Sequence, residues 1–334
     1  MPRLARMRST AALLLAAATA AGMATPADGH HRARPSRVHA HYLTGIGDES
    51  SAMFTDPLWR RLGTRIARYV APYDAAVDPR ERALARAWIT AASRAHQEIL
   101  VAFYHSEETP MRLPSVRAYA RDVARFIGMF PQVREYQPWN EANRGTVPRL
   151  LRSPSPVGSA RYYAALRRVC RRCTIVGLDV LDQADVRPTL RYIAAFKRAV
   201  HRLRVPEPRL WGLHNYSDTN RFSDRRTLAV ARATRGTLWL TETGGVVHFG
   251  RAFPNRHGSG LARAARALRY MFHIADVVPS VRRLYIYSWS GGTPSTRFDA
   301  GLTDAHGRPR PGYRVVCDVL LRDSPRCRVP VSRH

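Results

Sequence analysis

The sequence predicts a single-domain (β/α)8 barrel, the α/β fold in which eight parallel strands alternate with helices. Three observations lead to this prediction. Short apolar, β-rich runs alternate with amphipathic segments of helical period over residues 38–330. The alternation yields eight strands, the number that closes such a barrel. Polar and aromatic residues follow the strands, at the end of the barrel where loops reach the open face.

The eight expected strands have interiors made mostly of Val, Ile, Leu and Ala. They cover residues 38–46, 64–73, 98–106, 133–139, 174–181, 209–217, 237–244 and 283–289. The expected helical segments cover residues 80–96, 114–128, 157–170, 187–203, 223–234 and 260–276. A doubly wound open sheet is the alternative. It usually carries a Gly-rich phosphate loop after its first strand, and "LTGIGDES" (43–50) does not fit G-x-G-x-x-G.

The first residues have the layout of a secretory signal peptide. Arginines precede a short apolar stretch, and small residues suitable for cleavage follow, ending at Ala24 or at Ala27. The apolar stretch is too short to span a membrane comfortably. We therefore expect a signal peptide over 1–24, a disordered linker over 25–37 and one domain over 38–330. The mature protein is expected outside the cell, with no stable membrane insertion.

The net charge of +29 suggests nucleic-acid binding at first sight. Lys197 is, however, the only lysine among 54 basic residues, and the arginines are dispersed along the chain without a compact basic tract. This pattern does not favour a nucleic-acid partner. The net positive charge is still expected to attract anionic polymers in general.

The four cysteines form two local pairs in the sequence, Cys170 with Cys173 and Cys317 with Cys327. In an exported protein they indicate two disulfides, for which three connectivities are possible and the local one is simplest. Zinc binding is disfavoured because no histidine lies at finger spacing. A redox role for "CRRC" is disfavoured because the motif ends an expected helix.

Two carboxylates stand out among the residues that follow the strands. Glu141 comes directly after the fourth strand and Glu242 ends the seventh. These two strands lie on opposite sides of an eight-stranded barrel, so the two side chains can converge across its mouth. Hydrolysis of a glycoside needs such a pair flanking the sugar. Either glutamate alone could instead cap a helix or pair with an arginine.

Several motifs resemble those of the retaining barrel glycoside hydrolases of clan A, near families 5 and 39. "WNEAN" (139–143) is similar to their W-N-E-P-N, with alanine in place of proline. "HNY" (214–216), "LWLTETG" (238–244) and the tail "DAGLTDAHGRPRPGY" (299–313) also resemble clan segments. The likeness spans residues 40–315.

This resemblance implies roles for eight residues. Glu141 would be the acid/base and Glu242 the nucleophile. The implied substrate-binding residues are Arg68, His105, Asn140, His214, Tyr216 and Trp289, with Tyr216 bonded to the nucleophile and Trp289 stacking on the sugar. Arg68 and Tyr216 would favour the ionised form of Glu242, whereas a less solvated Glu141 would stay protonated longer.

The expected protein is a monomer that cleaves O-glycosidic, presumed β, bonds of an oligo- or polysaccharide and needs no cofactor or metal. A non-catalytic carbohydrate-binding barrel is the alternative, since it would keep the aromatic residues but need neither glutamate. The loops 217–223, 245–260 and 290–300 would select the sugar. Four arginines in them raise the hypothesis of an acidic substrate, namely Arg221, Arg251, Arg256 and Arg297.

Overall fold

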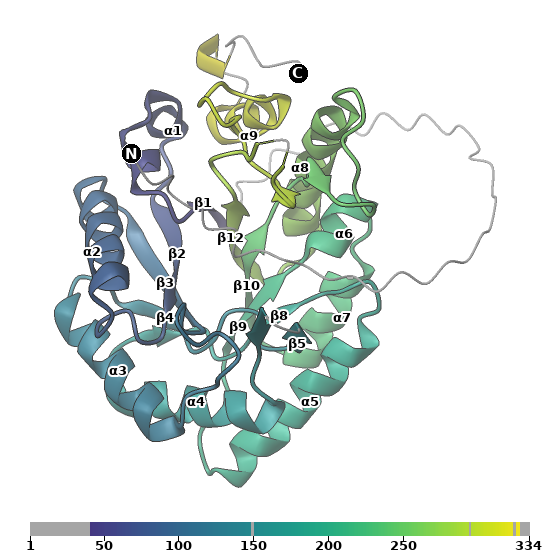
Figure 1. The fold of residues 1–334 in the computed structure, drawn as a ribbon. Helices are drawn as coiled ribbons and strands as arrows, with labels where there is room; N and C mark the ends of the chain where they lie inside the picture. The colour runs from purple at the N-terminus through teal and green to yellow at the C-terminus, as the bar shows by residue number, and fades with distance from the viewer. Residues whose placement is uncertain (1–40, 148–149, 294, 323–324, 328–334) are drawn as a thin grey trace.

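The structure, a computed structural model, describes residues 41–147, 150–293, 295–322 and 325–327. The expected signal peptide and linker, and the start of the expected first strand, lie outside these residues. The described part forms a curved parallel sheet surrounded by helices (Figure 1).

Nine strand segments follow one another around the sheet in the order β7-β4-β3-β2-β1-β12-β10-β9-β8. Their bounds are β1 Leu43–Gly47, β2 Ile66–Pro72, β3 Glu98–Tyr104, β4 Glu135–Gln137, β7 Thr174–Ile175, β8 Asp179–Leu181, β9 Leu210–His214, β10 Thr237–Thr243 and β12 Val281–Tyr287. Every neighbouring pair is parallel. All eight expected strands are therefore present.

The two ends of this sheet, β7 and β8, are halves of the expected fifth strand. On one side the amide of Val176 donates to the carbonyl of Tyr136 in β4, at 3.0 Å. On the other side the amide of Gly177 donates to the carbonyl of Leu210 in β9, at 2.9 Å. The segment thus joins β4 to β9 and closes the sheet on itself. The prediction of a barrel is confirmed, and the open doubly wound sheet is excluded.

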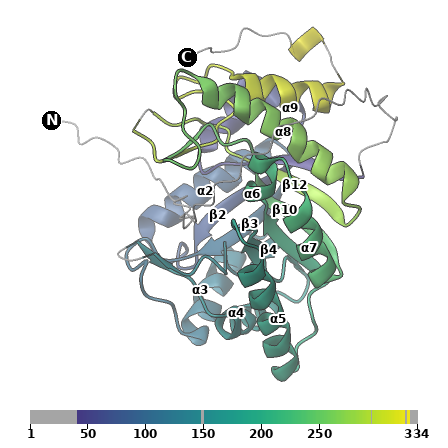
Figure 2. The ribbon, with the colours of Figure 1, turned by 90° about the vertical axis from the view of Figure 1, so that its right-hand side faces the viewer.

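Helices cover the outside of the sheet, as the view in Figure 2 shows from the side. They are α1 Pro57–Leu62, α2 Pro79–Arg94, α3 Val116–Met129, α4 Pro156–Val169, α5 Arg187–Arg202, α6 Tyr216–Arg221, α7 Arg225–Thr234, α8 Ser259–Val277 and α9 Pro311–Leu321. Two 3-10 helices are η1 Ser51–Thr55 and η2 Pro325–Cys327. Across the residues described, none of the helices has both the length and the apolar character that crossing a membrane requires.

Alternation along β2 separates the outer core from the barrel interior. Tyr69 points outward, where its ring stacks on Trp88 of α2 at 4.9 Å. Since side chains alternate along a strand, Arg68 and Ile66 face inward. Ile66 belongs to a separate apolar cluster, with Leu100, Val176, Trp239 and Tyr285. This layer fills the barrel beneath the buried guanidinium of Arg68, so the interior changes from apolar to charged toward the carboxyl ends of the strands.

Two short antiparallel pairs lie in the loops that follow the barrel strands. One joins β5 Thr146–Val147 to β6 Leu151–Arg152. The other joins β11 His248–Phe249 to β13 Phe298–Asp299. It links two of the loops expected to select the sugar, and the third contains α6. Arg310 anchors β13 through a buried bidentate ion pair with Asp299, at 2.7 and 2.8 Å.

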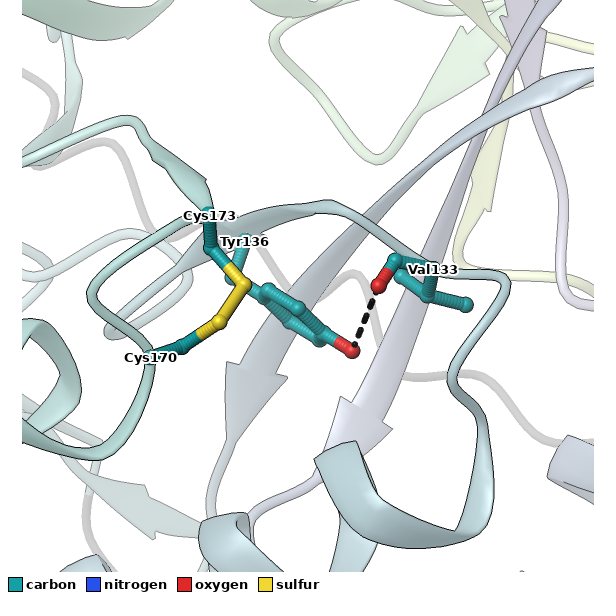
Figure 3. The surroundings of a disulfide bond; sticks show 4 residues. All are labelled: Val133, Tyr136, Cys170 and Cys173. Atoms are coloured by element: carbon teal, nitrogen blue, oxygen red, sulfur yellow. Dashed lines mark hydrogen bonds between the residues drawn. A yellow bond between two sulfur atoms is a disulfide. The ribbon is translucent and has the colours of Figure 1, made fainter.

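Both local disulfides form, with Cα–Cα distances of 5.4 Å for Cys170–Cys173 and 5.6 Å for Cys317–Cys327. Figure 3 shows the first beside the ring of Tyr136, whose hydroxyl donates to the carbonyl of Val133 at 3.3 Å. This disulfide ties the end of α4 to the start of β7. It therefore supports the segment that closes the barrel.

Candidate active site

A small cavity lies at the carboxyl ends of the barrel strands, where the sequence predicts a site. Its lining residues come from six parts of the ring: Glu49, Val70, Tyr104, Asn140, Glu141, Glu242 and Tyr287. Glu49, Val70 and Tyr287 are half-buried, while the other four are buried. The cavity therefore opens to solvent on the side of β1, β2 and β12.

Glu242 stands on β10 and is held by two donors. Nη1 of Arg68 donates to Oε2 at 3.0 Å, and the hydroxyl of Tyr216 donates to Oε1 at 3.1 Å. Arg68 comes from β2 and Tyr216 from the first turn of α6. Both were predicted for the site, and the predicted hydrogen bond of Tyr216 to Glu242 is present. Each carboxylate oxygen thus has its own donor.

Arg68 organises a buried polar layer under the cavity. Its Nε donates to Oε1 of Gln137 at 2.8 Å, and its Nη2 donates to Oδ1 of Asn140. The same Nη2 lies 3.8 Å from Oδ2 of Asp179. The planar guanidinium suits this task because its donors point in fixed directions in one plane. It joins residues of β2, β4, β8 and β10.

Glu141 lies in the loop directly after β4, in the left-handed backbone region with φ of 50°. A non-glycine residue in this region carries strain, which persists only where its surroundings hold it. Here Oδ2 of Asp179 accepts the amide of Glu141 at 3.1 Å, and the carbonyl of Asp179 accepts the amide of Ala142 at 2.9 Å. Asn143 bonds both the amide and the carbonyl of Leu181 in β8. The loop is therefore clamped to β8.

The carboxylate of Glu141 has two cationic neighbours. Nη1 of Arg144 donates to Oε2, and Nδ1 of His214 lies 3.2 Å from Oε1. Burial raises the pKa of Glu141, but Arg144 and His214 together outweigh it, so the pKa lies below that of an ordinary glutamate. We expected burial to keep Glu141 protonated. That expectation is wrong for the unliganded site, because it overlooked both cations.

His214 ends β9 and lies between the acidic groups. Its Nε2 is 3.0 Å from Oδ2 of Asp179, and its Nδ1 is 3.7 Å from Oε2 of Glu242. Burial lowers the pKa of His214, but the charges of Asp179 and Glu242 outweigh it and raise the pKa to about 10. The imidazole is therefore doubly protonated at neutral pH. Both of its nitrogens act as donors.

The two glutamates approach one another closely. Glu141, His214 and Glu242 each place one polar atom within 4.8 Å of the others, a spacing that could also surround a metal ion. A doubly protonated His214 has no lone pair to offer a metal, and Arg68 and Arg144 already neutralise the carboxylates. The arrangement therefore fits a paired-carboxylate site better than a metal site.

Glu49 is a third carboxyl group at the cavity, two residues after β1. Its pKa is raised to about 8, chiefly by burial and further by the charges of Asp48 and Glu242, while Arg68 opposes the rise. The hydroxyl of Tyr287 donates to its Oε2 at 3.3 Å. Glu49 is therefore largely protonated at neutral pH and can itself donate a hydrogen bond.

Two predicted site residues lie away from the cavity. His105 follows β3, but its Nδ1 bonds the carbonyl of Ser106 and it does not line the cavity. Trp289 is 2% exposed, and its indole N–H donates to Oδ2 of Asp56 at 3.0 Å. The structure thus gives Trp289 no open face for a sugar. Tyr104 and Tyr287 provide the aromatic walls instead.

Sequence analysis missed four polar site residues: Glu49, Gln137, Arg144 and Asp179. Asp48 and Glu49 follow β1 directly, so the strand-end rule that selected Glu141 could also have selected Glu49. Arg144 lies in the same loop as Glu141, three residues later. Nothing local marks Gln137 or Asp179, because their contacts join distant strands. The four arginines in the loops expected to select the sugar do not line the cavity. Arg221 lies over the ring of Phe253 instead.

No protein-family model matches this sequence, and no curated protein matches it. Solved structures with a similar fold do exist. A family 39 glycoside hydrolase from Bacteroides cellulosilyticus WH2 has a TM-score of 0.55 at 14% identity, over 86% of this chain and 65% of that one. A family 5 protein of Bifidobacterium longum, in complex with Manβ1-4GlcNAc, has a TM-score of 0.57 at 14% identity, over 87% and 80%.

Xylanase 10B of Thermotoga petrophila RKU-1, in complex with xylobiose, has a TM-score of 0.57 at 12% identity and is matched over 99% of its length. The chain spans only about half the length of two similar β-glucuronidases, 50% and 49%. These neighbours are glycoside hydrolases and include the families whose motifs the sequence resembles. At such low identity they establish the shared barrel fold and leave the activity to be argued from the site.

Proposed function

We propose that this protein is a secreted, cofactor-independent glycoside hydrolase that cleaves a β-O-glycosidic bond with retention of anomeric configuration. Glu242 is the nucleophile and Glu141 the acid/base. One observation carries the proposal. Two buried carboxylates from opposite sides of the barrel present oxygen atoms within 4.8 Å of each other at a cavity on the carboxyl face. Retaining enzymes hold their carboxyl groups about 5–5.5 Å apart, and inverting enzymes about 6.5–9.5 Å apart.

The surroundings of Glu242 suit a nucleophile. Arg68 and Tyr216 donate to its two oxygens, which holds the carboxylate in position to attack the anomeric carbon. Arg68 also fixes the carboxylate relative to Asn140. The Nδ2 group of Asn140 has no partner among the contacts of the described residues, and Asn140 lines the cavity. Its amide is suited to bond a ring hydroxyl as positive charge develops on the sugar.

Glu141 must carry a proton when the leaving group departs and must later accept one from water. In the unliganded site, Arg144 and His214 favour its ionised form. Bound substrate must therefore weaken at least one of these contacts before the first step. The clamp on Asp179 keeps the carboxyl group in position meanwhile, because it acts on the backbone amide rather than on the side chain.

The substrate is proposed to be an oligo- or polysaccharide, and the protein to act outside the cell as a monomer. Neighbouring structures contain xylobiose and Manβ1-4GlcNAc, which supports a saccharide at this kind of site. The two disulfides fit an oxidising compartment. The many arginines are proposed to attract acidic polysaccharides rather than to bind nucleic acid, because no compact basic tract is present in the sequence.

The decisive test compares Glu141→Ala with Glu242→Ala on a panel of aryl glycosides. Without Glu242 no glycosyl-enzyme forms, so every substrate should lose more than about 10⁴-fold in kcat. Without Glu141 an activated aryl group can still leave, and the intermediate should then accumulate. Azide should rescue Glu141→Ala to a product of retained configuration, and Glu242→Ala to an inverted product, as read by NMR.

Glu207→Ala is the matched control, because Glu207 is half-exposed and pairs with Lys197 on the outer surface. It should keep wild-type turnover. Wild-type turnover in both active-site variants would disprove the assignment. If the wild-type protein binds glycans but cleaves none of the glycosides, the non-catalytic carbohydrate-binding barrel is correct instead.

A further inference from the structure

Arg144 is a buried cation with unused donors. Its side chain is 3% exposed. Nη1 donates to Oε2 of Glu141 and, at 3.2 Å, to the hydroxyl of Tyr104. Nε and Nη2 are buried and have no hydrogen-bond partner among the described residues. Leaving donors of a charged group unpaired is costly, so such groups call for an explanation.

The free donors have a distinct chemical preference. The guanidinium fork matches the geometry of a carboxylate or sulfate group, which it can bind through two parallel hydrogen bonds. Arg144 does not itself line the cavity, but it is bonded to Tyr104 and Glu141, which both do. An anionic group that reaches past these two side chains would find a cation that still has donors free to bind it.

The charges of the site support the same ligand. Arg68, Arg144 and His214 are positive, and Glu141, Glu242 and Asp179 are negative, so the unliganded cluster is balanced. Protonating Glu141, as the proposed reaction requires, would leave one buried positive charge without a counter-charge. Burying such a charge is unfavourable unless it is paired. One negative charge on the substrate would restore the balance.

The position of Arg144 indicates which part of the substrate carries that charge. Oε1 of Glu141 faces His214, which in turn lies near Glu242. Oε2, the oxygen that His214 does not contact, accepts from Arg144. Since the sugar ring that reacts must sit over Glu242, Arg144 lies on the side of the departing group.

We propose that Arg144 recognises an anionic group, a carboxylate or a sulfate ester, on the leaving-group side of the scissile bond. The inference rests on the proposed function of the same site. Binding draws the guanidinium from Glu141 to the substrate anion, and Glu141 takes up a proton from solvent. That proton then passes to the glycosidic oxygen as the bond to the anomeric carbon breaks. Substrates with this anion are thus cleaved in preference to neutral ones.

The test uses aryl glycosides of whichever sugar the wild-type protein cleaves from a 4-methylumbelliferyl panel. Three leaving groups are compared: 3-carboxyphenyl, 3-sulfatophenyl and the neutral 3-carbamoylphenyl. We expect kcat/KM to favour an anionic leaving group by about 10- to 100-fold, the size of a hydrogen bond between charged groups. The carboxyl and sulfate arms show which anion fits better. Arg144→Gln should lose the preference.

Arg152→Gln is the matched control, because Arg152 lies in the same loop region but is exposed. It should keep the preference. Equal kcat/KM for anionic and neutral leaving groups in the wild type would overturn the inference, and so would an undiminished preference in Arg144→Gln. Circular dichroism checks that Arg144→Gln is folded, and Arg144→Lys should restore part of the preference because it keeps the charge.

A binding measurement separates this inference from the proposed function. Calorimetry compares 3-hydroxybenzoate with neutral 3-hydroxybenzamide, the corresponding free phenols. Wild type should bind the benzoate at least about 10-fold more tightly, and Arg144→Gln should not. Such binding without any glycoside cleavage would leave the anion site standing and reject the hydrolase. Equal binding of the two phenols would reject the anion site, whatever the activity.

Discussion

The two glutamates of the candidate site differ in what holds them. Glu242 belongs to a barrel strand, and its donors come from β2 and α6. Glu141 lies in a loop with a left-handed backbone, and its cationic partners are a loop arginine and a shared histidine. The Glu242 side is part of the barrel itself. The Glu141 side combines a loop with His214 of β9, and its loop partner, Arg144, can move away from Glu141 without disturbing a strand.

This difference fits the two roles proposed. A nucleophile keeps one charge state until it attacks, so permanent donors suit it. An acid/base must change its charge twice in each cycle, so it needs partners that can be released. Rigidity at Glu242 and replaceable contacts at Glu141 therefore belong to one mechanism.

The largest expected contrast is in stability. Arg68→Met should lower the free energy of unfolding by about 3–5 kcal/mol, because Glu242 and Asp179 lose a buried counter-ion. Arg144→Met should cost less, about 1–3 kcal/mol, because Glu141 keeps His214 and two unpaired donors disappear. Urea unfolding of both variants measures these losses of unfolding free energy, with Arg152→Met as the surface control. Equal losses would remove the distinction between the two sides.

Glu49 provides a pH test of the Glu242 side. Its pKa rises from an ordinary value near 4.5 to about 8 on folding, so the folded state binds its proton more tightly. The stabilisation is complete below about pH 4.5 and is lost as the pH rises through 8. Glu49→Gln should therefore gain stability relative to wild type between these values, by about 2 kcal/mol after screening. Parallel stability–pH curves would contradict the raised pKa.

Arg144 provides the matching pH test of the Glu141 side. Arg144, His214 and Asp179 act on the carboxyl group of Glu141, and Tyr104 and Glu242 lie beside it at the same cavity. Of these groups, Arg144 lowers the pKa of Glu141 most. Removing it in Arg144→Gln should raise this pKa. The alkaline limb of kcat/KM, where Glu141 loses its proton, should then move to higher pH on a neutral substrate. A limb that stays in place would mean that another group controls it.

The smallest expected contrast involves two tyrosines. Tyr216→Phe removes a direct hydrogen bond to Glu242 and should reduce kcat about 5- to 10-fold, equivalent to about 1 kcal/mol. Tyr104→Phe removes only an acceptor of Arg144 and should change kcat less on neutral substrates. Measuring kcat of both variants on one neutral aryl glycoside shows which substitution reduces turnover more. The reverse order would place the more sensitive contacts on the Glu141 side.

The barrel, and the clustering of six of the eight expected site residues, could be predicted because both follow from position along strands. Arg68 and Glu242 lie on strands whose alternation is clear in the sequence, and "WNEAN" marks the end of another. Trp289 does not line the cavity, because β12 ends at Tyr287 and the backbone amide of Trp289 is held by Asp48. His105 failed because its side chain bonds its own loop. Arg144 and Asp179 depend on contacts between distant segments, which no local pattern reveals.

The split fifth strand has a consequence for local opening of the fold. β7 pairs with β4 over two residues and β8 with β9 over three, whereas β2 and β3 pair over seven. Amides here should exchange with solvent deuterium faster than those of β2 or β3, at a free energy below that of global unfolding. Asp179 lies on this segment and holds the amide of Glu141. The backbone of Glu141 thus depends on a sparsely paired joint of the ring, so opening there would interrupt turnover while the rest of the barrel stays folded.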